Sequence, residues 1–137
     1  MVTHTNALLN CEAEFDEFIG RMTLLKEKLG PLLFQFPHFN RSELKGPGPL
    51  FSRLRVFLKR AAEAYKCRFA VQIRNRKLLD TRLTDLLGEH SVALALTDTS
   101  LMPRPSEYKE RFDLITADFT YVRWSLGSAA HAIGSME

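Results

Sequence analysis

Arg68-Phe-Ala-Val-Gln-Ile-Arg-Asn75 is the stretch of sequence that decides the fold class of this chain. A short apolar run bounded by polar residues is typical of a strand that is buried on both faces. The polar side chains of Gln72, Arg74 and Asn75 gather at the C-terminal end of the run. Parallel α/β folds bind ligands at that end of their strands, because the loops there are free to carry chemistry. The stretch therefore predicts a buried strand over 68–74 and marks its end as the place for a site.

Further strands and helices follow from the apolar pattern on either side. Short apolar stretches predict three more strands, at 32–36, 92–97 and 119–124. Apolar residues at three- and four-residue spacing predict helices at 11–29, 49–65 and 79–87. A long connection precedes the last strand, and a short helix is expected in it from Ser106. Strands that alternate with helices imply right-handed crossovers and therefore a parallel sheet.

The first helix has recognisable signals at both ends. Asn10 is its candidate N-cap, since an asparagine side chain accepts hydrogen bonds from the free N–H groups of the first turn. Gly30 and Pro31 are expected to end the helix. The apolar face predicted for it consists of Phe15, Phe18, Ile19, Met22, Leu25 and Leu29.

The order of elements leaves two architectures open. One is an open, doubly wound sheet, and the other is a piece of a (β/α)8 barrel. A complete barrel needs roughly 200 residues or more, whereas this chain has 137. The chain therefore supplies about half of a barrel if the second architecture holds.

Composition narrows the class of protein. Hydrophobic residues make up 45% of the chain and charged residues 26%, which is typical of a globular protein. The net charge of +3 is too small to argue for nucleic acid on its own. Cys11 and Cys67 lack the spacing of a disulfide framework or a zinc site. We expect a cytoplasmic location, because neither a signal peptide nor a membrane-spanning run is visible.

Four ordered blocks of sequence resemble the YecE-like family, which is known as domain of unknown function 72. The blocks are KLGPLLFQFP at 28–37, RFAVQIRN at 68–75, VALALTD at 92–98 and TADFTYVRW at 116–124. Thr3-His4 is similar to a further segment of the family, so the resemblance covers residues 2–125. It implies a TIM-type barrel without an established activity. We therefore predict an α/β fold of about four parallel strands alternating with helices, a partial TIM-type (β/α)8 barrel.

The chain departs from the family pattern at three places. Gln72 stands where the family carries a glutamate, and Leu78 or Leu79 stands where it carries a tryptophan. The resemblance also implies further barrel strands before Met1 and after Trp124, so a truncated reading of a longer barrel is expected. We place the partial barrel domain at 1–125. Residues 126–137 do not resemble the family and are expected to form a flexible tail.

Candidate ligand-binding residues lie at the predicted strand ends, and they are Gln35, Gln72, Arg74, Asn75, Asp98 and Arg123. Arg74 is interpreted as a fixed cation for a carboxylate or phosphate, with Gln72 orienting the ligand. Arg74 could instead form a structural ion pair with Asp98. An amide cannot exchange a proton as a carboxylate can, so Gln72 argues against catalysis. Catalytic residues therefore remain unknown.

Other candidates leave further alternatives open. Asp98 could act as a base or metal ligand, or could cap the turn that follows it. Gln35 could bind a ligand or a neighbouring backbone group. Alternation places Arg123 and Tyr121 on one face and Trp124 on the other, so Trp124 is predicted to pack rather than to line the site.

Metal and nucleic-acid sites are weaker predictions. His4 and His38 lie in loops on the ligand side, but no third ligand is evident and no metal site is predicted. The basic segment 74–82 could contact nucleic-acid phosphates, although a solvated helix start explains it as well. The sequence names no reaction and no cofactor. Its three function hypotheses are an anion-recognising barrel mouth, a nucleic-acid-associated module, and a non-functional fragment that self-associates through open sheet edges.

Overall fold

A four-stranded parallel sheet is the centre of the computed structural model, which describes residues 8, 10–39, 46–99 and 102–124. The strands follow the order of the chain, and all neighbours run parallel. They are β1 (Leu32–Gln35), β2 (Phe69–Gln72), β3 (Ala93–Asp98) and β4 (Tyr121–Trp124). Each of the four predicted strands is confirmed, with bounds that differ from the predicted ones by one to two residues at an end.

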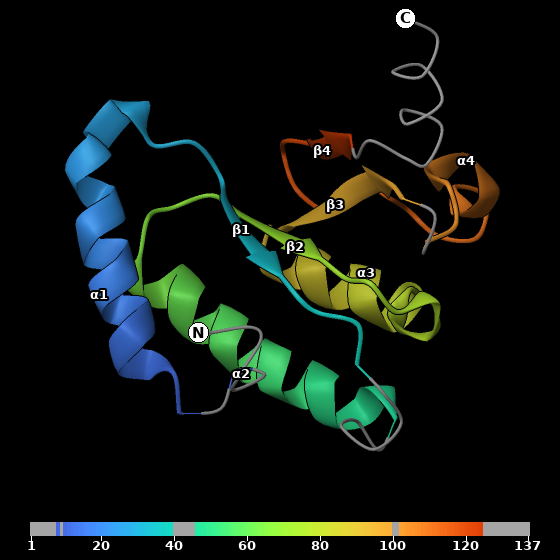
Figure 1. Cartoon of the computed structure of the whole chain (residues 1–137), viewed down its shortest axis with the longest axis horizontal. Helices are drawn as coiled ribbons and strands as arrows, with labels where there is room; N and C mark the ends of the chain where they lie inside the picture. The colour runs from blue at the N-terminus through green and yellow to red at the C-terminus, as the bar shows by residue number, and fades with distance from the viewer. Residues whose placement is uncertain (1–7, 9, 40–45, 100–101, 125–137) are drawn as a thin grey trace, which may run out of the picture.

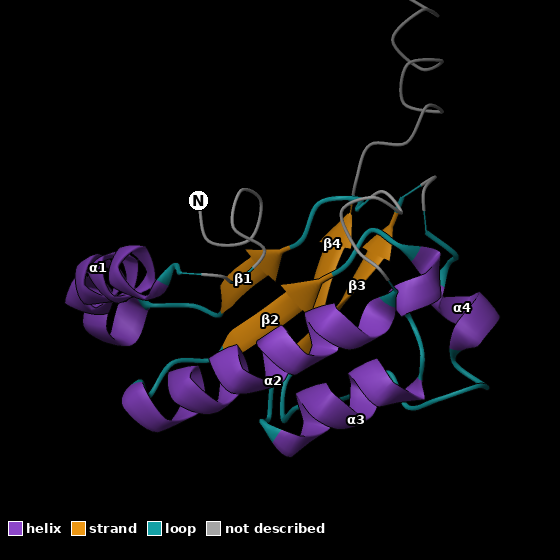
Figure 2. Cartoon of the chain, turned by 90° about the horizontal axis from the view of Figure 1, so that it is seen from below, coloured by secondary structure: helices purple, strands orange, loops and turns teal. Residues whose placement is uncertain are grey.

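The described helices all cover one face of the sheet, and within the same residues the other face carries none. The helices are α1 (Glu12–Met22), α2 (Pro47–Ala64), α3 (Thr81–Glu89) and the single-turn α4 (Pro105–Tyr108), with 3₁₀ turns η1 (Thr23–Lys28) and η2 (Arg76–Leu78). Figure 1 shows the curled sheet, and Figure 2 shows α2 and α3 side by side beneath it with α1 beyond β1. A doubly wound sheet would carry helices on both faces. The fold is therefore a partial TIM-type (β/α)8 barrel, as predicted from the sequence.

An aromatic cluster joins the convex face of the sheet to its helices. Phe34 of β1 lies 5.0 Å from Phe57 of α2 and 5.3 Å from Phe69 of β2, measured between ring centroids. Phe15 of α1 lies 4.7 Å from Phe57. All four rings are buried, and pairs at such distances stabilise a core beyond the burial of area alone. The convex face is thus the hydrophobic core, which leaves the concave face for polar side chains.

The helix starts follow local chemistry. Gly46 precedes α2 with a φ of 97°, a conformation that glycine adopts without strain, and Pro47 then opens the helix. The predicted start at Pro49 was therefore two residues late. Asp80 caps α3, since its side chain accepts a hydrogen bond of 3.2 Å from the backbone N–H of Leu83.

The structure corrects the predicted first helix. Its N-cap residue is Cys11, which makes no side-chain cap hydrogen bond, so the prediction of an Asn10 cap is wrong. The α-helix ends at Met22, and the chain continues as a 3₁₀ helix with fewer residues per turn. This change of period breaks the predicted apolar face, and Leu25 is exposed as a result. Phe18 is also 45% exposed, because no described element covers that side of α1.

Trp124 is a second correction. Its indole was predicted to pack, but the residue is 80% exposed. The predicted alternation itself holds, because Tyr121 and Arg123 are half-buried whereas Val122 and Trp124 are exposed. The convex face of β4 is bare because β4 is an edge strand and no described helix lies over it. No helix within the described ranges combines the length and apolarity needed to cross a membrane.

Candidate functional site

Three polar side chains from three strands meet on the concave face of the sheet. Arg123 of β4 donates from Nη1 to Oε1 of Gln72 on β2, at 2.9 Å. The same Nη1 donates to Oε1 of Gln35 on β1. The residues Gln35 and Gln72 are register partners, so their side chains stand beside one another on the same face. We call these three residues the concave cluster.

Arg123 reaches these amides by crossing over β3, which lies between β2 and β4. Its register partner on β3 is Thr97, and Ala95 is the partner of Tyr121. Both β3 side chains are short, so they leave room for the long arginine side chain to pass above them. The cluster therefore depends on the small side chains of Ala95 and Thr97 on β3 and on the long side chain of Arg123 on β4.

The cluster leaves part of the guanidinium unused. Nη1 is taken up by the two amide oxygens, whereas Nε and Nη2 have no acceptor among the residues that the structure describes. Within the same residues, no carboxylate lies within ion-pairing distance of Arg123. Gln72 is 2% exposed, and Gln35 and Arg123 are half-buried. The arrangement is a partly desolvated cation that neutral groups hold in a fixed position.

Asn75 is occupied by the backbone of the preceding βα loop. Its Oδ1 accepts from the N–H of Phe39 and its Nδ2 donates to the carbonyl of Phe39, both at 2.9 Å. This pair of bonds ties the segment after β1 to the segment after β2. Asn75 therefore positions the strand ends, and its amide groups point to Phe39 rather than to the concave cluster.

The remaining predicted site residues are not part of the cluster. Arg74 is half-buried just beyond β2 and forms no ion pair with Asp98, although the structure describes both residues. Asp98 is exposed and is the register partner of Trp124, so alternation puts it on the opposite face from Arg123. Asp98 thus lies at the end of a strand, as predicted, but on the other face of the sheet from the concave cluster.

The structure describes one of the two candidate histidines and the whole of the basic segment 74–82. His38 is exposed, and His4 lies outside the described residues, as does the predicted tail. No cluster of three or more histidine, cysteine or acidic side chains suited to a metal occurs in the described ranges. Within the basic segment, Arg82 is held by Asp80 and lies 5.4 Å from the ring centroid of Phe51. This arginine is therefore used within the fold.

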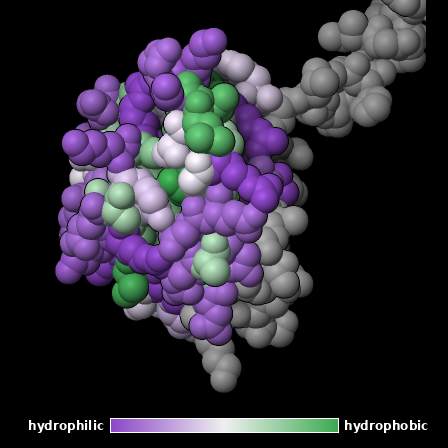
Figure 3. All heavy atoms as spheres, turned by 90° about the vertical axis from the view of Figure 1, so that its left-hand side faces the viewer, coloured by the Kyte–Doolittle hydropathy of each residue, from purple (hydrophilic) through white to green (hydrophobic). Residues whose placement is uncertain are grey.

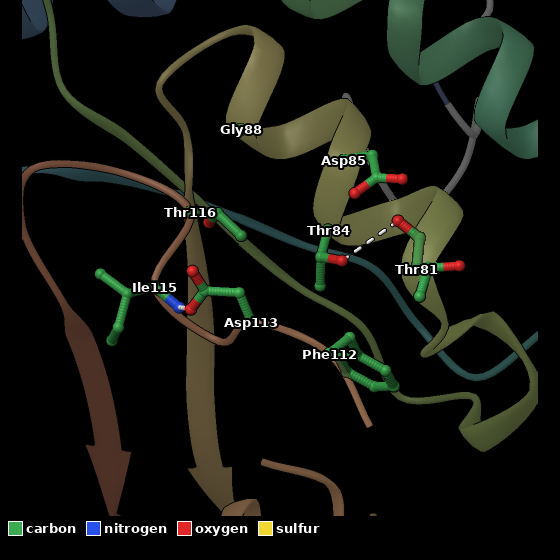
Figure 4. A pocket seen from close by; sticks show the side chains of 8 residues that line it. All are labelled: Thr81, Thr84, Asp85, Gly88, Phe112, Asp113, Ile115 and Thr116. Atoms are coloured by element: carbon green, nitrogen blue, oxygen red, sulfur yellow. Dashed lines mark hydrogen bonds between the residues drawn. The ribbon is translucent and has the colours of Figure 1, made fainter. Parts of the chain in front are cut away.

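A pocket that the sequence did not indicate lies on the convex side, between α3 and the segment that leads to β4 (Figure 4). Its volume is about 480 Å³. Two of the polar groups that line it are occupied locally, since Thr84 Oγ1 donates to the carbonyl of Thr81 and Asp113 Oδ1 accepts from the N–H of Ile115. The described lining also contains Asp85, so it carries two carboxylates and no cation, which does not suit an anion.

Comparison with known proteins bears on the fold and the family. A family model described as "Protein of unknown function DUF72" matches residues 1–134. Among solved structures, a DUF72 family protein from Thermotoga maritima MSB8 has a similar fold, with a TM-score of 0.65 and 20% identity. The match covers 93% of this chain and 46% of that protein, so the chain spans less than half the length of its relative. No curated protein matches the chain. Because the family model matches nearly the whole sequence, the chain belongs to the DUF72 family.

Proposed function

We propose that the concave cluster binds a small anion, a carboxylate or a phosphate, with Arg123 as the cation and Gln35 and Gln72 as its positioning groups. The observation that carries the proposal is the guanidinium held by two amide oxygens, whose Nε and Nη2 donors find no acceptor in the described part of the chain. The planar fork of an arginine matches two oxygens of a carboxylate or phosphate at once. A ligand on these donors would lie near the C-terminal ends of β1, β2 and β4, the end of the strands at which barrel folds bind their ligands.

Electrostatics favours an anion at this place. A partly buried cation without a charged partner carries a desolvation cost that an incoming anion relieves. The amide oxygens of Gln35 and Gln72 fix the guanidinium without neutralising its charge. They also reduce the entropy that the side chain loses when a ligand binds, because the side chain is already ordered. The cluster is therefore prepared for a negative ligand.

The same residues favour binding over proton transfer. Neither a glutamine amide nor an arginine guanidinium acts as a general acid or base near neutral pH. The proposed function of this chain is therefore recognition of an anion, and a reaction would need an acid or base from outside the cluster.

Titration of the full chain with inorganic phosphate and with malonate, followed by calorimetry or amide chemical shifts, tests the proposal. We expect both anions to bind and Arg123→Gln to weaken binding by about tenfold to a hundredfold, the equivalent of one charge-assisted hydrogen bond. The matched control is Arg55→Gln, which removes an exposed arginine that pairs with Glu89 on the helix side. Equal affinity of the parent and the Arg123 variant would disprove the anion site.

A further inference from the structure

Two exposed apolar surfaces lie at opposite edges of the sheet. The first, which we call the β4 strip, consists of Val122 and Trp124 on the convex face of β4. The second, the α1 strip, consists of Phe18, Leu24 and Leu25 on α1 and η1. Figures 1 and 2 show α1 at the β1 end of the molecule, away from β4, and Figure 3 looks onto that end, where hydrophobic patches break a hydrophilic surface.

The strands beneath these strips are also open. β1 and β4 each have one strand neighbour in the described sheet, so each presents an edge of unpaired backbone N–H and C=O groups. Natural edge strands are usually protected by an interior proline or by several charges. Neither strand contains a proline, and Arg123, the one charged residue in them, is directed to the concave cluster. Both edges are therefore suited to pairing with another strand.

The two edges and the two strips are complementary to each other. All four strands run in one direction, so a twofold rotation about the barrel axis places β1 of a second copy beside β4 in parallel orientation. In a (β/α)8 barrel, the helix before a strand covers the groove between that strand and its neighbour on the preceding side. The α1 strip of one copy would then cover the β4 strip of the other. The same rotation places β4 of the second copy beside β1 of the first, so both pairs of edges are joined and the assembly closes as a dimer.

We propose that two copies of this chain associate through their β1 and β4 edges, with the α1 strip of each copy packed on the β4 strip of the other. A second copy fits because it offers both features that the open edges require, a parallel strand and an apolar helix beside it. The pairing also brings the concave clusters of the two copies to the same end of one barrel, because all strands run in one direction. This inference rests on the sheet edges and the strips, and it holds or fails independently of the anion site.

Light scattering and sedimentation of the full chain across a range of micromolar concentrations test the association. We expect a species of twice the mass of one chain. Trp124 is the one tryptophan in the sequence, so its fluorescence reports directly on the β4 strip. Emission should shift to shorter wavelength as the concentration rises and the indole is covered. A single-chain mass with unchanged emission at every concentration would overturn the proposal.

Charge substitutions in the two strips test the partner and its symmetry. Trp124→Glu and Phe18→Lys alter exposed residues, so each variant should fold and remain monomeric at concentrations where the parent dimerises. A mixture of the two variants should form a heterodimer, because opposite charges meet at one interface and the other is unchanged. Val56→Glu, at a residue of α2 that is 71% exposed and outside both strips, is the matched control and should dimerise like the parent. The twofold barrel would be overturned by a mixture that stays monomeric or by a Val56 variant that dimerises no better than the strip variants. It would also be overturned if the Trp124 variant still formed aggregates larger than a dimer.

Discussion

Thr116 Oγ1 accepts a hydrogen bond of 2.8 Å from the backbone N–H of Leu94 at the start of β3. The same hydroxyl donates to the carbonyl of Val92 at 2.6 Å. Thr116 is buried and precedes β4 in the sequence. Its side chain bonds to backbone groups at the start of β3, as a neighbouring strand would do further along the sheet. The hydroxyl thereby satisfies two buried backbone groups that would otherwise lack partners.

We expect Thr116→Val to lower the free energy of unfolding by about 1–3 kcal/mol, because it keeps the volume but leaves the N–H of Leu94 buried without a partner. Urea denaturation monitored by circular dichroism measures the change. Thr116→Ser keeps the hydroxyl and should lose clearly less stability. If serine and valine were equally destabilising, the methyl group rather than the hydrogen bonds would be the important contact.

A second prediction concerns the contact between α1 and α2. Asp16 of α1 accepts from the Tyr65 hydroxyl at 2.6 Å and from Arg60 Nη2 at 2.7 Å. The hydrogen bond to Asp16, with desolvation as a smaller cause, raises the pKa of Tyr65 above the ordinary value of 10.0. A raised pKa in the folded state means that the folded protein holds this proton more tightly than the unfolded chain does.

The contribution of Tyr65 to stability should therefore be complete below pH 10 and decrease as the pH rises through the raised pKa. Thermal unfolding of the parent and of Tyr65→Phe, compared between neutral pH and pH above 10, measures this effect. The phenylalanine variant lacks the ionisable hydroxyl, so its stability should fall less steeply with alkaline pH. Parallel profiles for the two proteins would contradict the link between Tyr65 and Asp16.

The fold was largely predictable from the sequence because its signals are local. Apolar runs of strand length identified β1 to β4, and alternation along β4 assigned Arg123 and Trp124 to opposite faces. The expected burial of Trp124 and Phe18 failed because burial depends on what covers a face, and the described residues place nothing there. Periodicity shows that a face is apolar, but it does not show whether a neighbour is present.

The candidate site was predictable in part. Position at strand ends identified Gln35, Gln72 and Arg123 as candidates for one site at the barrel mouth, and these three side chains do meet. Arg123 crosses β3 to reach the two amides, and its position in the sequence does not predict this. The crossing depends on the small residues of β3 and on the register of the four strands. Asn75 and Asp98 satisfied the same positional rule, but Asn75 is tied to Phe39 and Asp98 points to the other face.

Asn75 provides a prediction that separates structure from binding. Asn75→Ala removes both hydrogen bonds to the backbone of Phe39, so we expect the free energy of unfolding to fall by about 1–3 kcal/mol. Phosphate affinity should stay within about twofold of the parent, a difference of less than 1 kcal/mol, because the concave cluster is unchanged. Paired denaturation and titration experiments on one preparation give both values. A stable variant that has lost phosphate binding would instead assign Asn75 to the ligand.

The last prediction concerns Gln72, which stands where the sequence resemblance to the family implies a glutamate. In Gln72→Glu, the introduced carboxylate would lie beside Nη1 of Arg123, because Oε1 of Gln72 is 2.9 Å from that nitrogen. The neighbouring cation should lower the pKa of the carboxylate below the ordinary value of about 4.3. At neutral pH the carboxylate is then ionised and neutralises the guanidinium. Sulfate affinity should fall by about tenfold or more, as expected for the loss of about one charge-assisted hydrogen bond.

The same variant should recover sulfate binding in acid. As the pH falls through the lowered pKa, the introduced carboxylate takes up a proton and the guanidinium regains its net charge. Sulfate keeps its own charge over this range, so a change in affinity reports on the protein. Calorimetric titrations of the parent and of Gln72→Glu at neutral and acidic pH make the comparison, and Gln72→Met, which removes the amide without adding charge, is the control. A methionine variant that loses sulfate binding as strongly as the glutamate variant would show that positioning of Arg123, and not its net charge, limits the affinity.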